Sequence, residues 1–109
     1  MKIETVQNYK CVVGKSKEEN WKLLDESNPN YLFFHLTSFP SCYVILQTEE
    51  KVDNNVIIEC ASLCLNNTKF RHLKNVYVDY TVVENVKKGD KVGEIWYKSF
   101  RKVNKVKIK

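Results

Sequence analysis

The sequence predicts an α+β domain in which two helices pack on a mostly antiparallel β-sheet, in the order ββ-α-ββ-α-βββ. Several runs alternate β-branched or aromatic residues with polar ones and are separated by short Gly, Asn, Ser or Pro segments, which is typical of strands and turns. Two other stretches carry apolar residues at helical spacing. The chain has 109 residues, enough for one modest core, so we expect a single domain covering residues 1–109.

The N-terminal half is expected to form four strands and one helix. The strands are predicted at residues 2–6, 10–13, 31–36 and 42–47. Ser16 is a good N-cap and Glu19 completes a capping box, so the helix begins there and runs to about Asp25 or Glu26. A Pro-containing loop, residues 38–41, joins the third and fourth strands, which we interpret as an antiparallel pair.

The C-terminal half is expected to form a second helix and three strands. The helix is predicted at residues 56–67, capped by Asp53 or Asn54. Its core-facing stripe consists of Ile57, Cys60, Ala61, Cys64 and Leu65. The strands are predicted at residues 76–82, 94–97 and 103–109, with residues 87 and 88 in a basic turn. In the last run Val106 and Ile108 fall on one face and Lys105, Lys107 and Lys109 on the other, so we interpret this sheet face as the working surface.

Positive charge is concentrated in the second half of the chain. Residues 1–54 hold six Lys and eight acidic residues, whereas residues 55–109 hold twelve Lys or Arg and five acidic residues. This asymmetry favours a surface that faces a polyanion. A solvated basic face that serves only solubility is the alternative.

Nothing in the sequence indicates a membrane or secreted protein. The longest apolar run is far below the roughly 20 residues that span a bilayer, and the N-terminus lacks a signal-peptide pattern. The four cysteines are therefore expected to be reduced. We expect an intracellular, cytoplasmic protein, with the nucleus as the alternative.

The sequence favours a protein that is not an enzyme. No nucleophile elbow, P-loop or dinucleotide-binding glycine pattern is present. A Cys42–His35 nucleophile pair and a metal site built on Cys60 and Cys64 are both conceivable, but packed core residues explain these positions better. We therefore expect no cofactor and no metal.

Basic and aromatic residues are interleaved between positions 87 and 102. They are Lys87, Lys88, Lys91, Trp96, Tyr97, Lys98, Phe100, Arg101 and Lys102. Lysines can contact phosphates and exposed aromatic rings can stack on unpaired bases. Since Trp96 and Tyr97 alternate along a strand, we expect one of them in the core and the other partly exposed.

Five segments form a recognisable pattern in their order and spacing. They are Gly14-Lys15-Ser16-Lys17-Glu18-Glu19-Asn20-Trp21-Lys22-Leu23-Leu24, Leu32-Phe33-Phe34-His35-Leu36, Ser41-Cys42-Tyr43-Val44-Ile45-Leu46, Val78-Asp79-Tyr80-Thr81, and Val86-Lys87-Lys88 with Val92-Gly93. Together they resemble the NFACT-R domain, the RNA-binding module of NEMF-type ribosome quality control proteins. The resemblance covers about residues 11–108. The chain departs from the family pattern at Phe33, where the family has Trp, and at Tyr43, where it has a second His.

The resemblance implies a domain that binds structured RNA such as tRNA or rRNA. The expected contact residues are Lys15, Asn20, His35, Tyr43, Lys87, Lys88, Lys98, Arg101 and Lys102. The lysines and arginine would hold phosphates, while His35 and Tyr43 would line an adjacent polar groove. DNA is an alternative ligand. An adaptor that docks on ribosome-associated or other acidic proteins is the alternative function.

Overall fold

The computed structural model describes residues 1–37 and 39–108 of the chain. The described strands are β1 (Lys2–Val6), β2 (Tyr9–Val13), β3 (Leu32–Leu36), β4 (Val44–Leu46), β5 (Tyr77–Val82), β6 (Val86–Lys88), β7 (Ile95–Tyr97) and β8 (Asn104–Lys107). The α-helices are α1 (Lys17–Glu26) and α2 (Asn54–Asn66), and the 3-10 turns are η1 (Val83–Asn85) and η2 (Phe100–Lys102). This order confirms the predicted α+β class.

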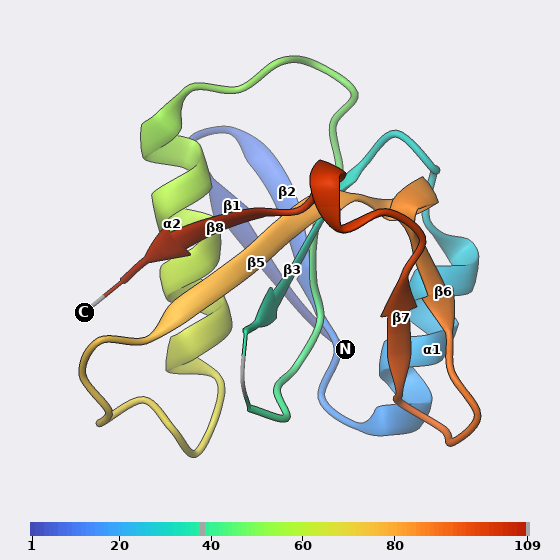
Figure 1. Cartoon of the computed structure of the whole chain (residues 1–109). Helices are drawn as coiled ribbons and strands as arrows, with labels where there is room; N and C mark the ends of the chain where they lie inside the picture. The colour runs from blue at the N-terminus through green and yellow to red at the C-terminus, as the bar shows by residue number, and fades with distance from the viewer. Residues whose placement is uncertain (38, 109) are drawn as a thin grey trace.

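Six strands form one antiparallel sheet in the order β1-β2-β4-β3-β5-β8 (Figure 1). The β1–β2 connection places Gln7 and Asn8 at φ 45° and 74°, the two positive values that a type I′ hairpin turn requires. The predicted antiparallel pairing of the third and fourth strands is confirmed, with Phe33 opposite Ile45. Ser38, in the predicted loop between them, lies outside the described residues.

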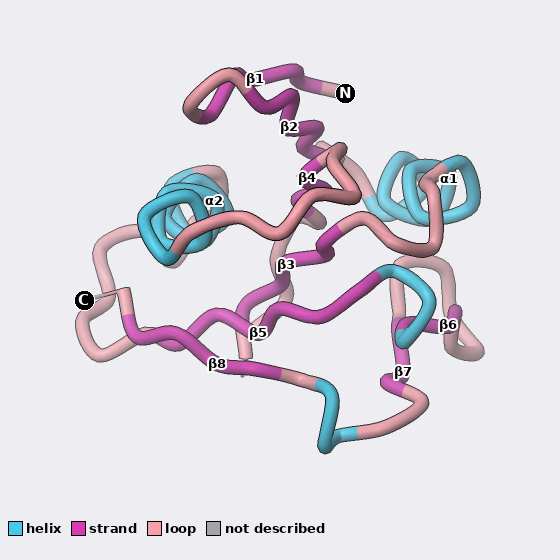
Figure 2. The backbone as a smooth tube through the Cα atoms, turned by 90° about the horizontal axis from the view of Figure 1, so that it is seen from above, coloured by secondary structure: helices cyan, strands magenta, loops and turns pink. Residues whose placement is uncertain are grey.

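The sheet is covered on both faces (Figure 2). Helix α2 lies on one face, while α1 and the β6–β7 hairpin lie on the other. Because strand side chains alternate between faces, neighbouring residues enter different cores. Phe34 and Val44 belong to the cluster that includes the buried residues of α2, and Phe33 and Ile45 belong to the cluster that includes those of α1.

The two helices begin at the predicted caps. Ser16 Oγ accepts the Glu19 N–H at 3.1 Å, but Glu19 Oε1 accepts the Lys15 N–H at 2.9 Å instead of that of Ser16. Helix α2 begins two residues earlier than expected, with Asp53 Oδ1 accepting the Val56 N–H at 3.2 Å. Its predicted stripe is confirmed, because every member is buried.

The C-terminal strands differ from the prediction in one respect. Lys87 and Lys88 were expected in a turn, but they belong to β6, which pairs with β7 in a separate two-stranded sheet. The η1 turn, held by buried Asn85, directs the chain out of the main sheet. Asn85 Nδ2 donates to Ser99 O at 2.9 Å, and its Oδ1 accepts the Ser99 N–H at 2.9 Å. The hairpin is therefore closed at its base by one buried amide.

The β8 strand lies at the edge of the main sheet beside β5. Val106 and Ile108 are half-buried against the α2-side core, as their spacing predicted. The Lys105 Nζ lies 2.6 Å from the carboxylate of Asp79, so this ammonium group is engaged in an ion pair. Lys107 is exposed, and Lys109 lies outside the described residues.

Candidate nucleic-acid interface

Four loops meet at one end of the main sheet, at the lower end of the molecule in Figure 1, and enclose an open groove of about 710 Å³. They are the β2–α1 connection, the loop before β4, the segment after α2 and the tip of the β6–β7 hairpin. The polar lining residues of these loops include Lys15, Ser16, Ser41, Asn67, Thr68 and Lys69. Three polar side chains from regular elements also line the groove, namely Lys17 and Asn20 of α1 and His35 of β3.

Asn20 is held rigidly beneath the groove. Its side-chain Oδ1 accepts the Tyr43 N–H at 3.2 Å, and the residue is only 7% exposed. A Cβ at position 14 would lie 2.1 Å from this oxygen, so Gly14 is needed for the close approach. Because Oδ1 is used by Tyr43, the amide nitrogen is left without a hydrogen-bond partner among the described residues, and it is not cut off from solvent. It is a donor available to the groove.

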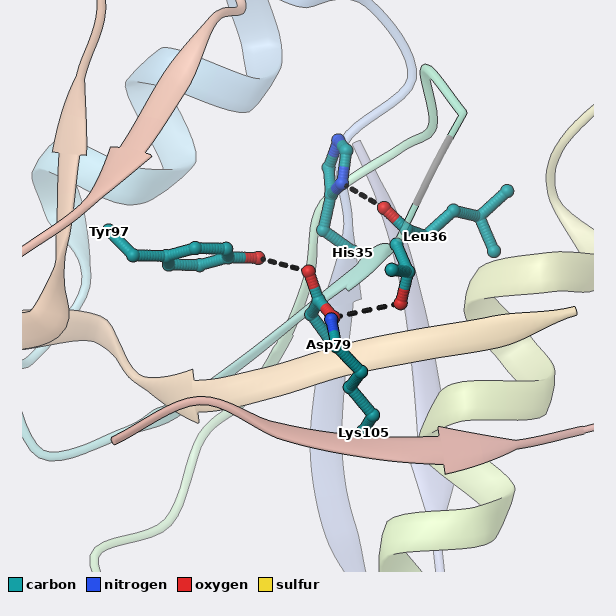
Figure 3. Close-up of polar contacts among 6 residues, drawn as sticks. His35, Leu36, Asp79, Tyr97 and Lys105 are labelled. Carbon is teal, nitrogen blue, oxygen red and sulfur yellow. Dashed lines mark hydrogen bonds and ion pairs between the residues drawn. The ribbon is translucent and has the colours of Figure 1, made fainter. Parts of the chain in front are cut away.

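His35 presents a second free group. Its Nδ1 lies 2.7 Å from Leu36 O, which requires the proton on Nδ1 because a carbonyl oxygen can only accept. Figure 3 shows the other ring nitrogen pointing away from Leu36 and from Asp79. Burial lowers the pKa of His35, although the Leu36 hydrogen bond and the Asp79 charge oppose this effect. The imidazole is therefore neutral at pH 7, with Nε2 as an acceptor.

The rim of the groove is positively charged. Lys15 and Lys17 flank the N-terminus of α1, and Lys69 follows α2. All three are exposed, and none forms an ion pair within residues 1–37 and 39–108. No Asp or Glu of the described residues lines the groove. It is consequently suited to an anionic ligand.

A second cationic surface follows the hairpin. Lys87 and Trp96 are directly opposed across β6 and β7, so both project from the same, outward face. Trp96 is 52% exposed, and Phe100, in the turn after β7, is 79% exposed. The exposed cations Lys98, Arg101 and Lys102 lie in the same segment. We call Lys87, Trp96, Lys98, Phe100, Arg101 and Lys102 the hairpin surface.

The predicted contact residues therefore divide into three groups. Lys15, Asn20 and His35 meet in the groove, and Lys87, Lys98, Arg101 and Lys102 lie on the hairpin surface. Lys88 is exposed but already paired, with its Nζ 2.9 Å from Asp25 and above the Trp21 ring. Tyr43 is fully buried, so it supports the groove from beneath instead of lining it.

Tyr43 also anchors the hairpin. Its hydroxyl donates to Gly93 O at 2.6 Å, and this joins the residue before β4 to one fifty positions later. Its ring has no exposed surface. Trp96 is exposed, which confirms the expectation that one of Trp96 and Tyr97 is exposed.

Sequence reasoning missed two groove lysines. Lys17 and Lys69 belong to the groove but were not among the predicted contacts, and their positions on different elements gave no local signal. Trp96 and Phe100 stood within the basic and aromatic stretch but were also not among the predicted contacts. Strand alternation predicted that one of Trp96 and Tyr97 is exposed, but not which one.

The cysteines form two separate contacts. Cys11 Sγ and Cys60 Sγ lie 3.5 Å apart in the α2-side core, and all four cysteines are free thiols. Cys42 donates its thiol hydrogen to Cys64 O at 3.5 Å. Cys60 and Cys64 therefore face different partners, and residues 1–37 and 39–108 contain no cluster of three or more His, Cys, Asp or Glu suited to a metal.

Comparison with known proteins identifies the family. The family described as "NFACT protein RNA binding domain" matches residues 1–99. The chain belongs to this family. Within the described residues of this NFACT-R domain, no helix combines the length and the apolar character needed to cross a membrane.

Curated relatives of this NFACT-R domain are longer than the chain. The "Coiled-coil domain-containing protein 25 homolog" of Dictyostelium discoideum is 31% identical over 108 residues, which is 91% of this chain and 52% of the relative. The "Rqc2 homolog RqcH" of Bacillus subtilis is 28% identical over 99 residues, 88% of this chain and 17% of the relative. The chain thus spans about half, or less, of the length of these relatives.

A solved structure shares the fold. The C-terminal part of the fibronectin/fibrinogen-binding protein from Streptococcus suis matches with a TM-score of 0.86. The match covers 96% of this chain and 43% of that chain, at 22% sequence identity. The chain therefore shares the fold of this solved structure.

One buried carboxylate connects the hairpin of this NFACT-R domain to its main sheet (Figure 3). Asp79 of β5 is 5% exposed and accepts hydrogen bonds from Thr37 Oγ1 at 2.8 Å and Tyr97 OH at 3.1 Å. Lys105 supplies the third donor. Because Tyr97 lies on β7, this network fixes the orientation of the hairpin surface.

Proposed function

We propose that this NFACT-R domain binds structured RNA, such as tRNA or rRNA, in translation or ribosome quality control, and that it does so without catalysing a reaction. The observation that carries the proposal is the pairing of exposed Trp96 with exposed Lys87 on a rigid hairpin, in a chain whose family is described as RNA-binding. The similarity to RqcH supports the ribosome quality control context.

The hairpin surface combines the two kinds of contact that unpaired RNA needs. Lys87, Lys98, Arg101 and Lys102 would neutralise phosphates, and this contribution is independent of sequence and sensitive to salt. Trp96 would stack on a base, a contact worth about 1–3 kcal/mol per base. Structured RNAs present such bases in loops and bulges, where proteins read them most often.

The other predicted cations have supporting roles in this proposal. Lys88 is held by Asp25, so it would add to the local potential without contacting a phosphate. Lys15 would extend the cationic surface into the groove. We place the protein in the cytoplasm, where tRNA, rRNA and ribosome-associated proteins are all accessible.

Fluorescence anisotropy with labelled tRNA at several salt concentrations tests the proposal. Lys87→Glu should weaken binding and reduce the slope of log affinity against log salt by about 1, since one phosphate contact is lost. Trp96→Ala should weaken binding about 5- to 150-fold with little change in slope. Lys51→Glu is the matched control. Lys51 is exposed in the connection before α2, and its replacement by Glu changes the net charge by the same amount.

Equal effects of Lys87→Glu and Lys51→Glu would contradict the proposed surface. A duplex DNA of similar length, measured in parallel, tests DNA as the alternative ligand. The adaptor alternative makes a different prediction: a protein partner recovered with the wild-type chain would remain bound after nuclease treatment.

A further inference from the structure

We propose that the groove binds one ribonucleotide of the RNA chain and that Asn20 and His35 recognise its 2′-hydroxyl group. The domain would then distinguish RNA from DNA of the same sequence. This inference rests on the proposed function, because it assigns a second part of the same ligand to a site separate from the hairpin surface.

The two free groups in the groove match a hydroxyl. Asn20 offers an N–H donor and His35 offers an Nε2 acceptor, whereas a 2′-hydroxyl can both accept and donate one hydrogen bond. Both residues adjoin Tyr43: Asn20 binds its backbone N–H, and the His35 ring centroid lies 5.8 Å from that of Tyr43. A deoxyribose would leave both groups without a partner.

Both groups are fixed before any ligand arrives. The Leu36 carbonyl sets the tautomer and the orientation of His35, and the ring stacks on Phe33 at 6.2 Å between centroids. Asn20 cannot rotate without losing the Tyr43 N–H. Binding therefore costs little side-chain entropy, and this makes a small hydrogen-bonding difference between RNA and DNA measurable.

The rim supplies the charge that a nucleotide requires. Lys15, Lys17 and Lys69 surround the groove without an acidic residue among its described lining. The volume of about 710 Å³ falls within the range of small-molecule sites. Phosphates on either side of the bound ribose could then contact lysines while the sugar reaches Asn20 and His35.

The protonation state of His35 gives the proposal a second, independent signature. The titratable groups shown to act on or pack against the imidazole are Asp79 of β5 and Tyr43, the residue before β4. Asp79 is in turn contacted by Tyr97 of β7 and Lys105 of β8. Burial outweighs Asp79 and lowers the pKa of His35. At neutral pH Nε2 accepts a hydrogen bond, and as pH falls below the lowered pKa it becomes a donor.

The test compares four fluorescent oligonucleotides of one sequence: RNA, DNA, 2′-fluoro RNA and 2′-O-methyl RNA. The wild-type protein should bind RNA about tenfold more tightly than DNA, which corresponds to the loss of two hydrogen bonds that each lie toward the lower end of the usual range. The 2′-fluoro chain keeps an RNA-like sugar pucker without a donor, so it should bind like DNA. The 2′-O-methyl chain, which also lacks the donor, should bind no better.

His35→Phe removes the acceptor and retains an aromatic ring against Phe33. We expect the RNA-to-DNA affinity ratio to fall toward one while DNA affinity stays unchanged. Lys87→Glu is the matched control, since it should weaken RNA and DNA alike and leave the ratio intact. If His35→Phe does not fold, the wild-type ratio measured from neutral to acidic pH replaces it. The ratio should change as His35 is protonated, because Nε2 then donates to the hydroxyl oxygen instead of accepting its hydrogen.

The outcomes separate the two proposals. Three results would each overturn the 2′-hydroxyl inference and leave the proposed RNA binding intact. They are equal wild-type affinity for RNA and DNA, RNA-like binding of the 2′-fluoro chain, and an RNA-to-DNA affinity ratio that neither His35→Phe nor acid alters. Failure of the wild-type protein to bind any of the four oligonucleotides and tRNA would overturn the proposed function itself.

Discussion

Replacement of Asp79 by Ala should destabilise the protein by about 3–4 kcal/mol, because three donors converge on this buried carboxylate. Each hydrogen bond from Thr37 or Tyr97 to the charged group contributes roughly 1.5 kcal/mol. The Lys105 side chain is 53% exposed, so its ion pair adds at most about 1 kcal/mol after screening by solvent.

Two further variants separate these contributions. Asp79→Asn should cost only about 1 kcal/mol, since an amide oxygen still accepts from Thr37 and the Tyr97 hydroxyl can accept from the amide nitrogen. Lys105→Ala should also cost at most about 1 kcal/mol. The expected order of destabilisation is Asp79→Ala first, followed by the other two at similar values.

Urea unfolding at pH 7, followed by tryptophan fluorescence, measures this order. Trp21 is a suitable reporter because its Nε1 donates to Glu94 O at 3.0 Å and so reports on docking of the hairpin. The reasoning would be refuted if Asp79→Ala cost no more than Lys105→Ala. In that case the carboxylate would not be the anchor between β5 and β7.

Two other predictions concern the packing of the hairpin. Gly93→Ala should destabilise the protein by about 2 kcal/mol, because residue 93 has φ 89° and an added Cβ would lie 2.6 Å from Lys17 Cβ. Thermal unfolding measures this effect as a lower midpoint temperature, and an unchanged midpoint would contradict the prediction. Burial is the largest cause that raises the pKa of both Tyr43 and Tyr97, so two of the six tyrosines should form phenolates only at higher pH than the others. Stability should accordingly fall as pH rises above about 10, where the unfolded chain loses protons that the folded protein retains, and alkaline absorbance and unfolding titrations check both effects.

The parts of the fold that local patterns encode were predictable. Helix α2 follows from its apolar stripe and from Asp53, because helical periodicity and an N-cap act within a few residues. The apolar run of β3 and the alternating run of β5 likewise indicated strands. These elements needed no information from distant parts of the chain.

The hairpin required tertiary information. The β6 strand is three residues long and contains two lysines, so its sequence carries no strand pattern. Its existence depends on pairing with β7 and on Asn85, whose partner Ser99 is fourteen residues away. The same limit applies to Tyr43, since its hydroxyl acceptor at Gly93 is distant in sequence.

The candidate site was predictable in part for the same reason. Lys15, Asn20 and His35 lie on three elements, and only the resemblance to a family, not spacing, brought them together. Lys17 and Lys69 could be assigned to the groove only from the positions of the loops at the end of the sheet in the folded structure. Alternation predicted that one of Trp96 and Tyr97 is exposed, whereas the ion pair of Lys88 with Asp25 depends on the packing of α1 against the hairpin.

The most direct test of RNA binding is the anisotropy of labelled tRNA and duplex DNA with the wild-type protein, measured across several salt concentrations. We predict tight binding of tRNA with a steep salt dependence that Lys87→Glu reduces by about one phosphate contact. Equal, weak binding of both nucleic acids, with the same salt dependence in Lys87→Glu, would contradict the account and leave the basic surface as a generic solvated face.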